Sequence, residues 1–169
     1  MDTKIISKSL VMSHRQCPRR AWLESRGEVP MQYSAESTFG FEQGKAVHAL
    51  ARAAMPEGVM VPQALTLPAA AEVTRAWLDG GTPTLFEAGF VAGRLGVRCD
   101  LLEQADDGLL VTEVKSSGSV KPEQIEDCAI QHACLSLAGV PVKAIRIAHV
   151  DGTTRGLLVF SAISDGTKS

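Results

Sequence analysis

The chain has 169 residues, of which 45% are hydrophobic and 21% charged, and its net charge at neutral pH is −2. It has no apolar run near the roughly 18 residues that a membrane span needs, and no signal-peptide segment, so we expect a cytoplasmic protein without a membrane partner. The size predicts one domain over residues 1–169. The alternative is that the chain is the N-terminal part of a longer protein. The oligomeric state is left open.

The N-terminal segment is basic although the whole chain is slightly acidic. Residues 1–26 contain six Lys or Arg residues and only two Asp or Glu residues. Such a segment can contact phosphates, and an ordinary solvated helix face is an equally good interpretation. The four cysteines form no Cys-x-x-Cys pair, which argues against a zinc knuckle.

The first half of the chain is expected to be helical. Pro18 suits the first position of a helix, and Ser13 is a candidate cap for a turn before it. Residues 26–37 and 56–68 are rich in Gly, Pro or Ser and predict irregular structure. Apolar residues at helical spacing predict two more helices, over residues 38–54 and 69–78.

The second half is expected to contain most of a sheet. Three strand-like runs, separated by two Gly-containing turns, cover residues 84–91, 97–102 and 109–114. A helix is predicted from Pro122 to Leu137, and two final strands over residues 142–149 and 156–160. This order predicts an α/β fold: a mixed sheet that contains a three-stranded antiparallel meander and is flanked by helices.

The most informative residues are Asp100, Glu113 and Lys115, on two of the predicted strands. Strand residues two apart share a face, so Glu113 and Lys115 point the same way. Carboxylates hold hard divalent cations, and a nearby lysine can orient or deprotonate an attacking water. The pattern therefore predicts metal-assisted phosphodiester cleavage. On these three residues alone, surface charges on a hairpin are an equally good interpretation. The apolar residues beside them favour strands in a core and therefore the metal site.

Four further residues are candidates for the same site. His48 lies one helical turn after Gly44, which would let this helix approach a sheet or a phosphate closely. Glu87, on the first strand of the meander, is either a second-metal ligand or an outward-facing charge. Asp127 and Gln131 are one helical turn apart and form a polar edge, which is either part of the site or an ordinary solvated edge of the helix. Gln131 could bind Lys115, a metal-bound water or a phosphate.

Taken together, these residues resemble the RecB-like branch of the PD-(D/E)xK nuclease superfamily. The resemblance is closest to the exonucleases associated with CRISPR systems and their uncharacterised bacterial relatives. It covers roughly residues 5–160. Its pieces, in chain order, are residues 17–20, 44–48, Glu87, Asp100, residues 113–117 and residues 127–131.

The resemblance implies a restriction-endonuclease-like fold and a role for each matching residue. His48, Asp100 and Glu113 would bind Mg²⁺ or Mn²⁺, together with the carbonyl of Val114. Lys115 would be the catalytic lysine. Gln131 matches a glutamine that follows the core in this branch and would act with the catalytic residues. Leu135 stands where a tyrosine usually follows, which is a departure from the pattern.

A larger departure concerns iron. The CRISPR-associated relatives hold an iron–sulfur cluster through one N-terminal cysteine and three cysteines near the C-terminus. Cys17 matches the first, but no cysteine follows Cys134. An iron–sulfur cluster is therefore not expected.

The sequence thus predicts a metal-dependent deoxyribonuclease, acting as an exonuclease, whose partner is DNA. Arg19, Arg20 and Lys121 are the candidate contacts to the DNA backbone. The alternative is a catalytically inactive module that keeps the nuclease fold for DNA or protein binding. A phosphodiesterase acting on RNA is a third interpretation.

Overall fold

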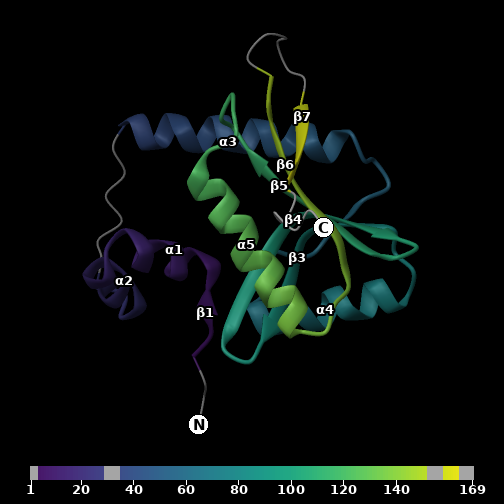
Figure 1. Cartoon of the computed structure of the whole chain (residues 1–169), viewed down its shortest axis with the longest axis horizontal. Coiled ribbons are helices and arrows are strands. Elements are labelled where there is room, and N and C mark those ends of the chain that lie inside the picture. The colour runs from purple at the N-terminus through teal and green to yellow at the C-terminus, as the bar shows by residue number, and fades with distance from the viewer. Residues whose placement is uncertain (1–3, 29–34, 152–157, 164–169) are drawn as a thin grey trace, which may run out of the picture.

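A mixed sheet forms the centre of the molecule in the computed structural model, which describes residues 4–28, 35–151 and 158–163 (Figure 1). The strand order is β2-β3-β4-β5-β6-β7, and β1 pairs separately with β4. The bounds are β1 Ile6–Ser7, β2 Val59–Met60, β3 Thr84–Ala92, β4 Leu95–Ala105, β5 Gly108–Lys115, β6 Val142–Val150 and β7 Leu158–Ile163. The predicted mixed α/β sheet flanked by helices is confirmed.

The predicted meander is part of a longer sheet of mixed direction. Strands β3, β4 and β5 pair in antiparallel fashion. Parallel pairs adjoin this trio at β2–β3, β5–β6 and β1–β4. The three strands are therefore not a separate, clear-cut meander. The short turns between them favour antiparallel pairing, whereas α5 carries the chain across to a parallel strand.

Five helices surround the sheet in the described residues: α1 Lys8–Gln16, α2 Pro18–Ser25, α3 Ala35–Ala53, α4 Leu67–Asp79 and α5 Pro122–Leu137. Helices α3 and α5 cover opposite faces. Cys128 of α5 packs in one core cluster with Val111, and Val47 of α3 packs in another with Val114. Val111 and Val114 are an odd number of residues apart on β5, so they face opposite ways. None of the described helices is long and apolar enough to cross a membrane.

Several predicted boundaries were wrong. Ser13 lies inside α1, whose N-cap is Ser7; the Ser7 hydroxyl accepts a hydrogen bond from the Leu10 N–H. The stretch 56–68, predicted to be irregular, contains the two-residue strand β2 and the start of α4. Such short strands have no periodicity to detect and depend on their neighbours in the sheet. Helix α3 begins at Ala35, inside the predicted loop, and residues 29–34 and 156–157 lie outside the described residues.

Gly44 also differs from its prediction. A Cβ added to Gly44 would meet nothing within 4 Å, so this glycine does not serve a close approach between α3 and the sheet. The close approach occurs at Gly89 on β3, where an added Cβ would lie 2.7 Å from the Cβ of Ala70 on α4. At the same place the buried Thr74 hydroxyl accepts a hydrogen bond of 2.9 Å from the Gly89 N–H. Helix α4 is therefore fastened to the sheet by a hydrogen bond to backbone.

We expect Thr74→Val to lower the free energy of unfolding by about 1–3 kcal/mol, because it leaves the buried Gly89 N–H without its acceptor while preserving side-chain shape. Urea denaturation would measure the change. An unfolding midpoint equal to that of the wild type, with an unchanged slope, would contradict the role given to this hydrogen bond.

Candidate metal centre and lysine cluster

The sheet splits between β4 and β5 at the predicted site. The two strands are paired from Leu101 and Thr112 to the hairpin that joins them. Beyond that point Glu113, Val114 and Lys115 pair only with β6. The Asp100 carboxylate bridges the split, because its Oδ2 accepts a hydrogen bond of 2.7 Å from the Val114 N–H. A side chain thus satisfies a backbone group that the ladder leaves free.

Three side chains from three elements meet beside this split, and we call them the metal group: His48 of α3, Glu87 of β3 and Asp100 of β4. One ligand atom from each lies within 4.8 Å of the others. His48 Nε2 is 3.9 Å from Asp100 Oδ2. Burial lowers the pKa of His48, which favours the neutral imidazole that can bind a metal. The two carboxylates and the imidazole therefore lie close enough together to hold a metal ion.

Glu87 has a backbone conformation that is unusual for its residue type. Its φ is +57°, in the left-handed region, and it is the one non-glycine residue with positive φ in the described part of the chain. Arg98 supports it, with Nη1 donating to the Glu87 carbonyl at 3.1 Å. Such strain persists only where the surroundings impose it, and it is concentrated at functional sites.

The strain at Glu87 coincides with a break in the side-chain alternation of both neighbouring strands. Leu85 and Ala88 lie in the same core cluster although they are three residues apart. Cys99 and Leu102, their partners on β4, do the same. Regular strands would place each pair on opposite faces. The irregularity therefore releases Glu87 and Asp100 from the regular pattern at the metal group.

A second group adjoins the first, and we call it the lysine cluster: Lys8, Glu113, Lys115, Asp127 and Gln131. Lys115 Nζ lies 2.5 Å from Glu113 Oε1 and 2.7 Å from Asp127 Oδ2. Lys8 Nζ lies 3.2 Å from both Glu113 oxygens and 3.0 Å from Asp127 Oδ1. Gln131 Nε2 donates to Glu113 Oε2 at 2.5 Å. Both oxygens of Glu113 are thus occupied by the protein itself.

Two buried carboxyl groups at this site, those of Asp100 and Glu113, are harder to ionise than usual. Burial raises the pKa of Asp100 to about 6. Burial, followed by repulsion from Asp100, raises the pKa of Glu113 to about 7 despite its two lysine partners. The carboxylates raise the pKa of Lys8 and Lys115 against the opposing effect of burial, so both lysines stay charged. The site is therefore an electrostatic assembly in which each charge depends on the others.

The structure divides the predicted residues between the two groups. It joins His48 and Asp100 with Glu87, which had been an open candidate, and it places Glu113 in the lysine cluster. The assignment of Glu113 and of the Val114 carbonyl as metal ligands stays a prediction, because the contact recorded for Val114 at the site is its N–H. Asp127 supports the two lysines. Gln131 donates a hydrogen bond to Glu113, whereas the predicted partners were Lys115, a metal-bound water or a phosphate.

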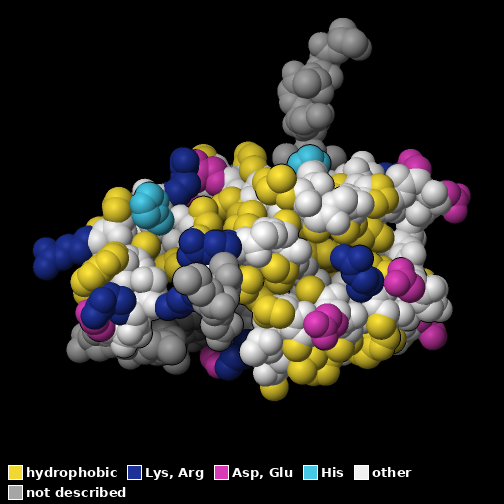
Figure 2. All heavy atoms as spheres, turned by 90° about the horizontal axis from the view of Figure 1, so that it is seen from below, with side chains coloured by type: hydrophobic (Ala, Val, Ile, Leu, Met, Phe, Trp, Pro, Cys, Tyr) yellow, Lys and Arg dark blue, Asp and Glu magenta, His cyan; other side chains and the backbone are white. Residues whose placement is uncertain are grey.

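The predicted DNA-binding residues are exposed and lie outside both groups. Arg19 and Arg20 are on α2, where Arg20 forms an ion pair of 2.7 Å with Glu24. Lys121 is the N-cap residue of α5. Figure 2 shows Lys and Arg side chains mostly toward the end of the molecule that α1 and α2 occupy, and Asp and Glu mostly toward the other end. The basic N-terminal segment is therefore a basic end of the folded protein.

Sequence reasoning missed Lys8. It counted only as one of six basic residues near the N-terminus, and no motif marks it. Its neighbours offer one weak signal: a lysine directly after the helix-capping Ser7 is unfavourable next to the positive end of a helix. Only the pairing of β1 with β4 brings it to Glu113.

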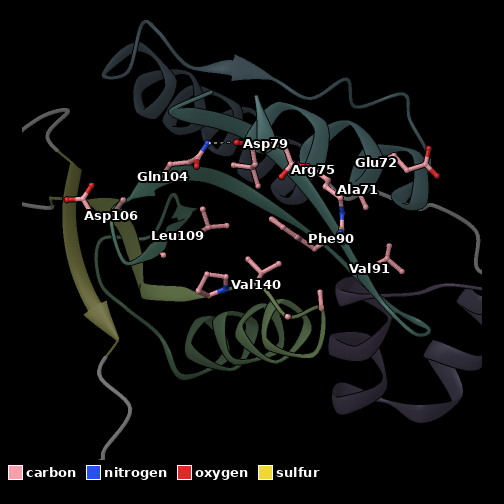
Figure 3. A pocket seen from close by; sticks show the side chains of 16 residues that line it. Ala71, Glu72, Arg75, Asp79, Phe90, Val91, Gln104, Asp106, Leu109 and Val140 are labelled. Atoms are coloured by element: carbon pink, nitrogen blue, oxygen red, sulfur yellow. Dashed lines mark hydrogen bonds between the residues drawn. The ribbon is translucent and has the colours of Figure 1, made fainter. Parts of the chain in front are cut away.

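One cavity in the described part of the chain lies away from this chemistry. It has a volume of about 550 Å³ and is bounded by α4, β3 and the segment after α5 (Figure 3). Phe90, Leu109 and Val140 point into it, while Arg75 and Asp79 come from α4. Its lining contains no residue of the metal group or the lysine cluster.

A scan against protein-family models finds no model that matches this chain, and a search of curated proteins finds no match to it either.

We expect Glu87→Gly to be more stable than Glu87→Gln by about 1 kcal/mol in the presence of EDTA. Both variants remove the charge, but only glycine relieves the left-handed backbone strain, and its own chain-entropy cost offsets part of the gain. Chemical denaturation of the two variants would measure the difference. A less stable Glu87→Gly variant would show that this conformation is not strained.

We also expect the metal-free protein to lose stability as the pH rises from about 5 to 8. The raised pKa values of Asp100 and Glu113 mean that the folded state binds more protons than the unfolded state in this range, so a rise in pH favours unfolding. Urea midpoints measured in EDTA across this range would test the slope. Glu113→Gln should flatten it, and a midpoint that rises with pH would contradict the assignment.

Proposed function

We propose that this protein is a metal-dependent deoxyribonuclease of the RecB-like PD-(D/E)xK type, with a restriction-endonuclease-like fold. The observation that carries the proposal is the contact of a His–Glu–Asp group with a lysine cluster at a split between two central strands. One group suits a divalent cation and the other offers ammonium groups to an anion. Metal-assisted hydrolysis of a phosphodiester bond can use both, the cation to polarise the phosphate and an ammonium group to offset the charge that develops on it.

The residues of the metal group fit Mn²⁺ and tolerate Mg²⁺. They offer one neutral imidazole nitrogen and two carboxylates, a mixed set of nitrogen and oxygen donors. Asp100 has one oxygen on the Val114 N–H, which orients its carboxylate. A divalent ion bound there would polarise a phosphoryl oxygen and lower the pKa of a bound water.

Lys115 is the residue of this chain that we assign to the reacting phosphate or to the attacking water. Glu113 and Asp127 bind its ammonium group, and 25% of its side chain is exposed to solvent. Buried partners fix the direction of a flexible side chain before substrate arrives. Gln131 holds the other oxygen of Glu113, so the clamp is itself oriented.

Support for DNA as the substrate comes from the basic end of the protein. Arg19 and Arg20, both exposed on α2, are the residues that we assign to the DNA backbone. Such contacts position a strand without reading its sequence. The alternative is a catalytically inactive module that kept the nuclease fold for binding DNA or protein. A comparison of DNA cleavage with metal binding distinguishes this alternative from an active nuclease.

We expect Asp100→Asn and Lys115→Met each to reduce cleavage by at least about a hundredfold, because the first weakens the group that would hold the cation and the second removes the positive charge assigned to the reacting phosphate or to the attacking water. The assay is digestion of end-labelled linear and circular DNA with Mn²⁺, Mg²⁺ or EDTA. Cleavage of linear DNA only would indicate an exonuclease.

Lys45→Met is the matched control, because Lys45 is an exposed residue of α3 paired with Glu42 and contacts neither group. It should retain the wild-type rate. Calorimetric titration with Mn²⁺ should show binding that Asp100→Asn weakens. Mn²⁺ binding without any cleavage would support the inactive module, and undiminished cleavage in Lys115→Met would contradict the mechanism.

A further inference from the structure

An open cavity between α1 and α5 continues from the lysine cluster. Its volume of about 520 Å³ lies in the usual range of ligand pockets. Lys8 and Lys115 line it together with Glu113 and Asp127, so one wall of the cavity is the lysine cluster itself. The other walls carry small or amide side chains, namely Ser9, Ser13, Gln16 and Gln124, with Met12 and Glu123.

The position of Lys8 on the wall of this cavity is electrostatically unfavourable for two reasons. It is the first residue of α1, where the helix dipole disfavours a positive charge, and its side chain is only 17% exposed. Strand β1 fixes it there, because Ile6 and Ser7 pair with the start of β4. Two unfavourable placements of one charge need a compensating interaction, and Glu113 and Asp127 supply it.

The two lysines are held differently. Lys115 is 2.5 Å from Glu113 and 2.7 Å from Asp127, whereas the contacts of Lys8 are 3.0–3.2 Å long. Longer contacts are weaker, and an ammonium group carries three donors that can be shared between partners. Lys8 therefore has the longer contacts of the two lysines, and these are the contacts that an anionic ligand could most readily share.

Charge decides which ligand suits the cavity. The lysine cluster is balanced, with two ammonium groups against two carboxylates, and the third carboxylate of the cavity lining belongs to Glu123, an exposed residue in the first turn of α5. A cation there would compete with the lysines, whereas the neighbouring metal group has two carboxylates and no ammonium group of its own. Hydroxyl and amide groups along the cavity can donate hydrogen bonds to phosphate and sugar oxygens.

We propose that the cavity between α1 and α5 binds the nucleotide next to the scissile bond, and that Lys8 binds the phosphate of this nucleotide. This inference rests on the proposed nuclease function and names where the strand continues beyond the metal group. The strand would then pass from the metal group over Lys115 to Lys8. Lys8 serves DNA binding and is not needed to hold the metal.

This assignment makes two opposite predictions for one substitution. In Lys8→Met, DNA loses a charge-assisted contact, so its affinity should fall about tenfold. The metal group loses a nearby positive charge, so its affinity for Mn²⁺ should stay the same or increase. A residue needed only for structure would weaken both.

The experiment uses the full chain and a fluorescently labelled oligonucleotide, bound in Ca²⁺ and followed by anisotropy, with Mn²⁺ titrated separately by calorimetry. Ser9→Trp is a second variant, because the exposed Ser9 lines the cavity and tryptophan would fill it while Lys8 stays in place. It should weaken oligonucleotide binding about tenfold and leave Mn²⁺ affinity unchanged. Lys45→Met is again the control and should match the wild type in both measurements.

The outcomes separate this inference from the nuclease proposal. Wild-type cleavage together with unchanged oligonucleotide affinity in Lys8→Met or in Ser9→Trp would overturn the cavity assignment alone. Loss of both oligonucleotide and Mn²⁺ affinity in Lys8→Met would show a structural role and would also overturn it. A wild-type protein that neither binds nor cleaves DNA would overturn both proposals.

Discussion

The burial of one carboxylate governs the rest of this site. Glu113 is 2% exposed and lies on a central strand, where an unpaired charge would be strongly destabilising. Its partners come from three elements, with Lys8 on α1, Lys115 on β5 itself and Gln131 on α5. The helices on either side of the split are therefore tied to the sheet through the same group that organises the chemistry. Removing either lysine would leave Glu113 with one ammonium partner in place of two, in a buried position where charge is costly.

The two groups share a border but differ in charge. The lysine cluster balances its own charges, while the metal group gathers two carboxylates and an imidazole with no ammonium group among them. This asymmetry favours a cation on one side and an anion on the other. Phosphodiester hydrolysis with a metal uses that separation, because charge developing on the phosphate must be met from both sides.

The backbone around the metal group is irregular in two ways, and both have a physical cause. The split between β4 and β5 frees the Val114 N–H, which Asp100 then binds. The left-handed conformation of Glu87 breaks the alternation and is supported by Arg98. Each irregularity is unfavourable by itself, and the surrounding apolar core offsets it.

Much of the local structure could be predicted from the sequence. Helix α5 and strands β3 to β6 have strong periodicity and clear Pro or Gly boundaries, and Asp100, Glu113 and Lys115 stand out as charges in apolar strands. Tertiary structure alone decided how the charges are grouped. Glu87 joined His48 and Asp100 because of a backbone angle that no periodicity encodes, and Lys8 reached Glu113 through a two-residue strand. Local patterns report which face a residue takes, whereas partners distant in the chain depend on how the elements pack.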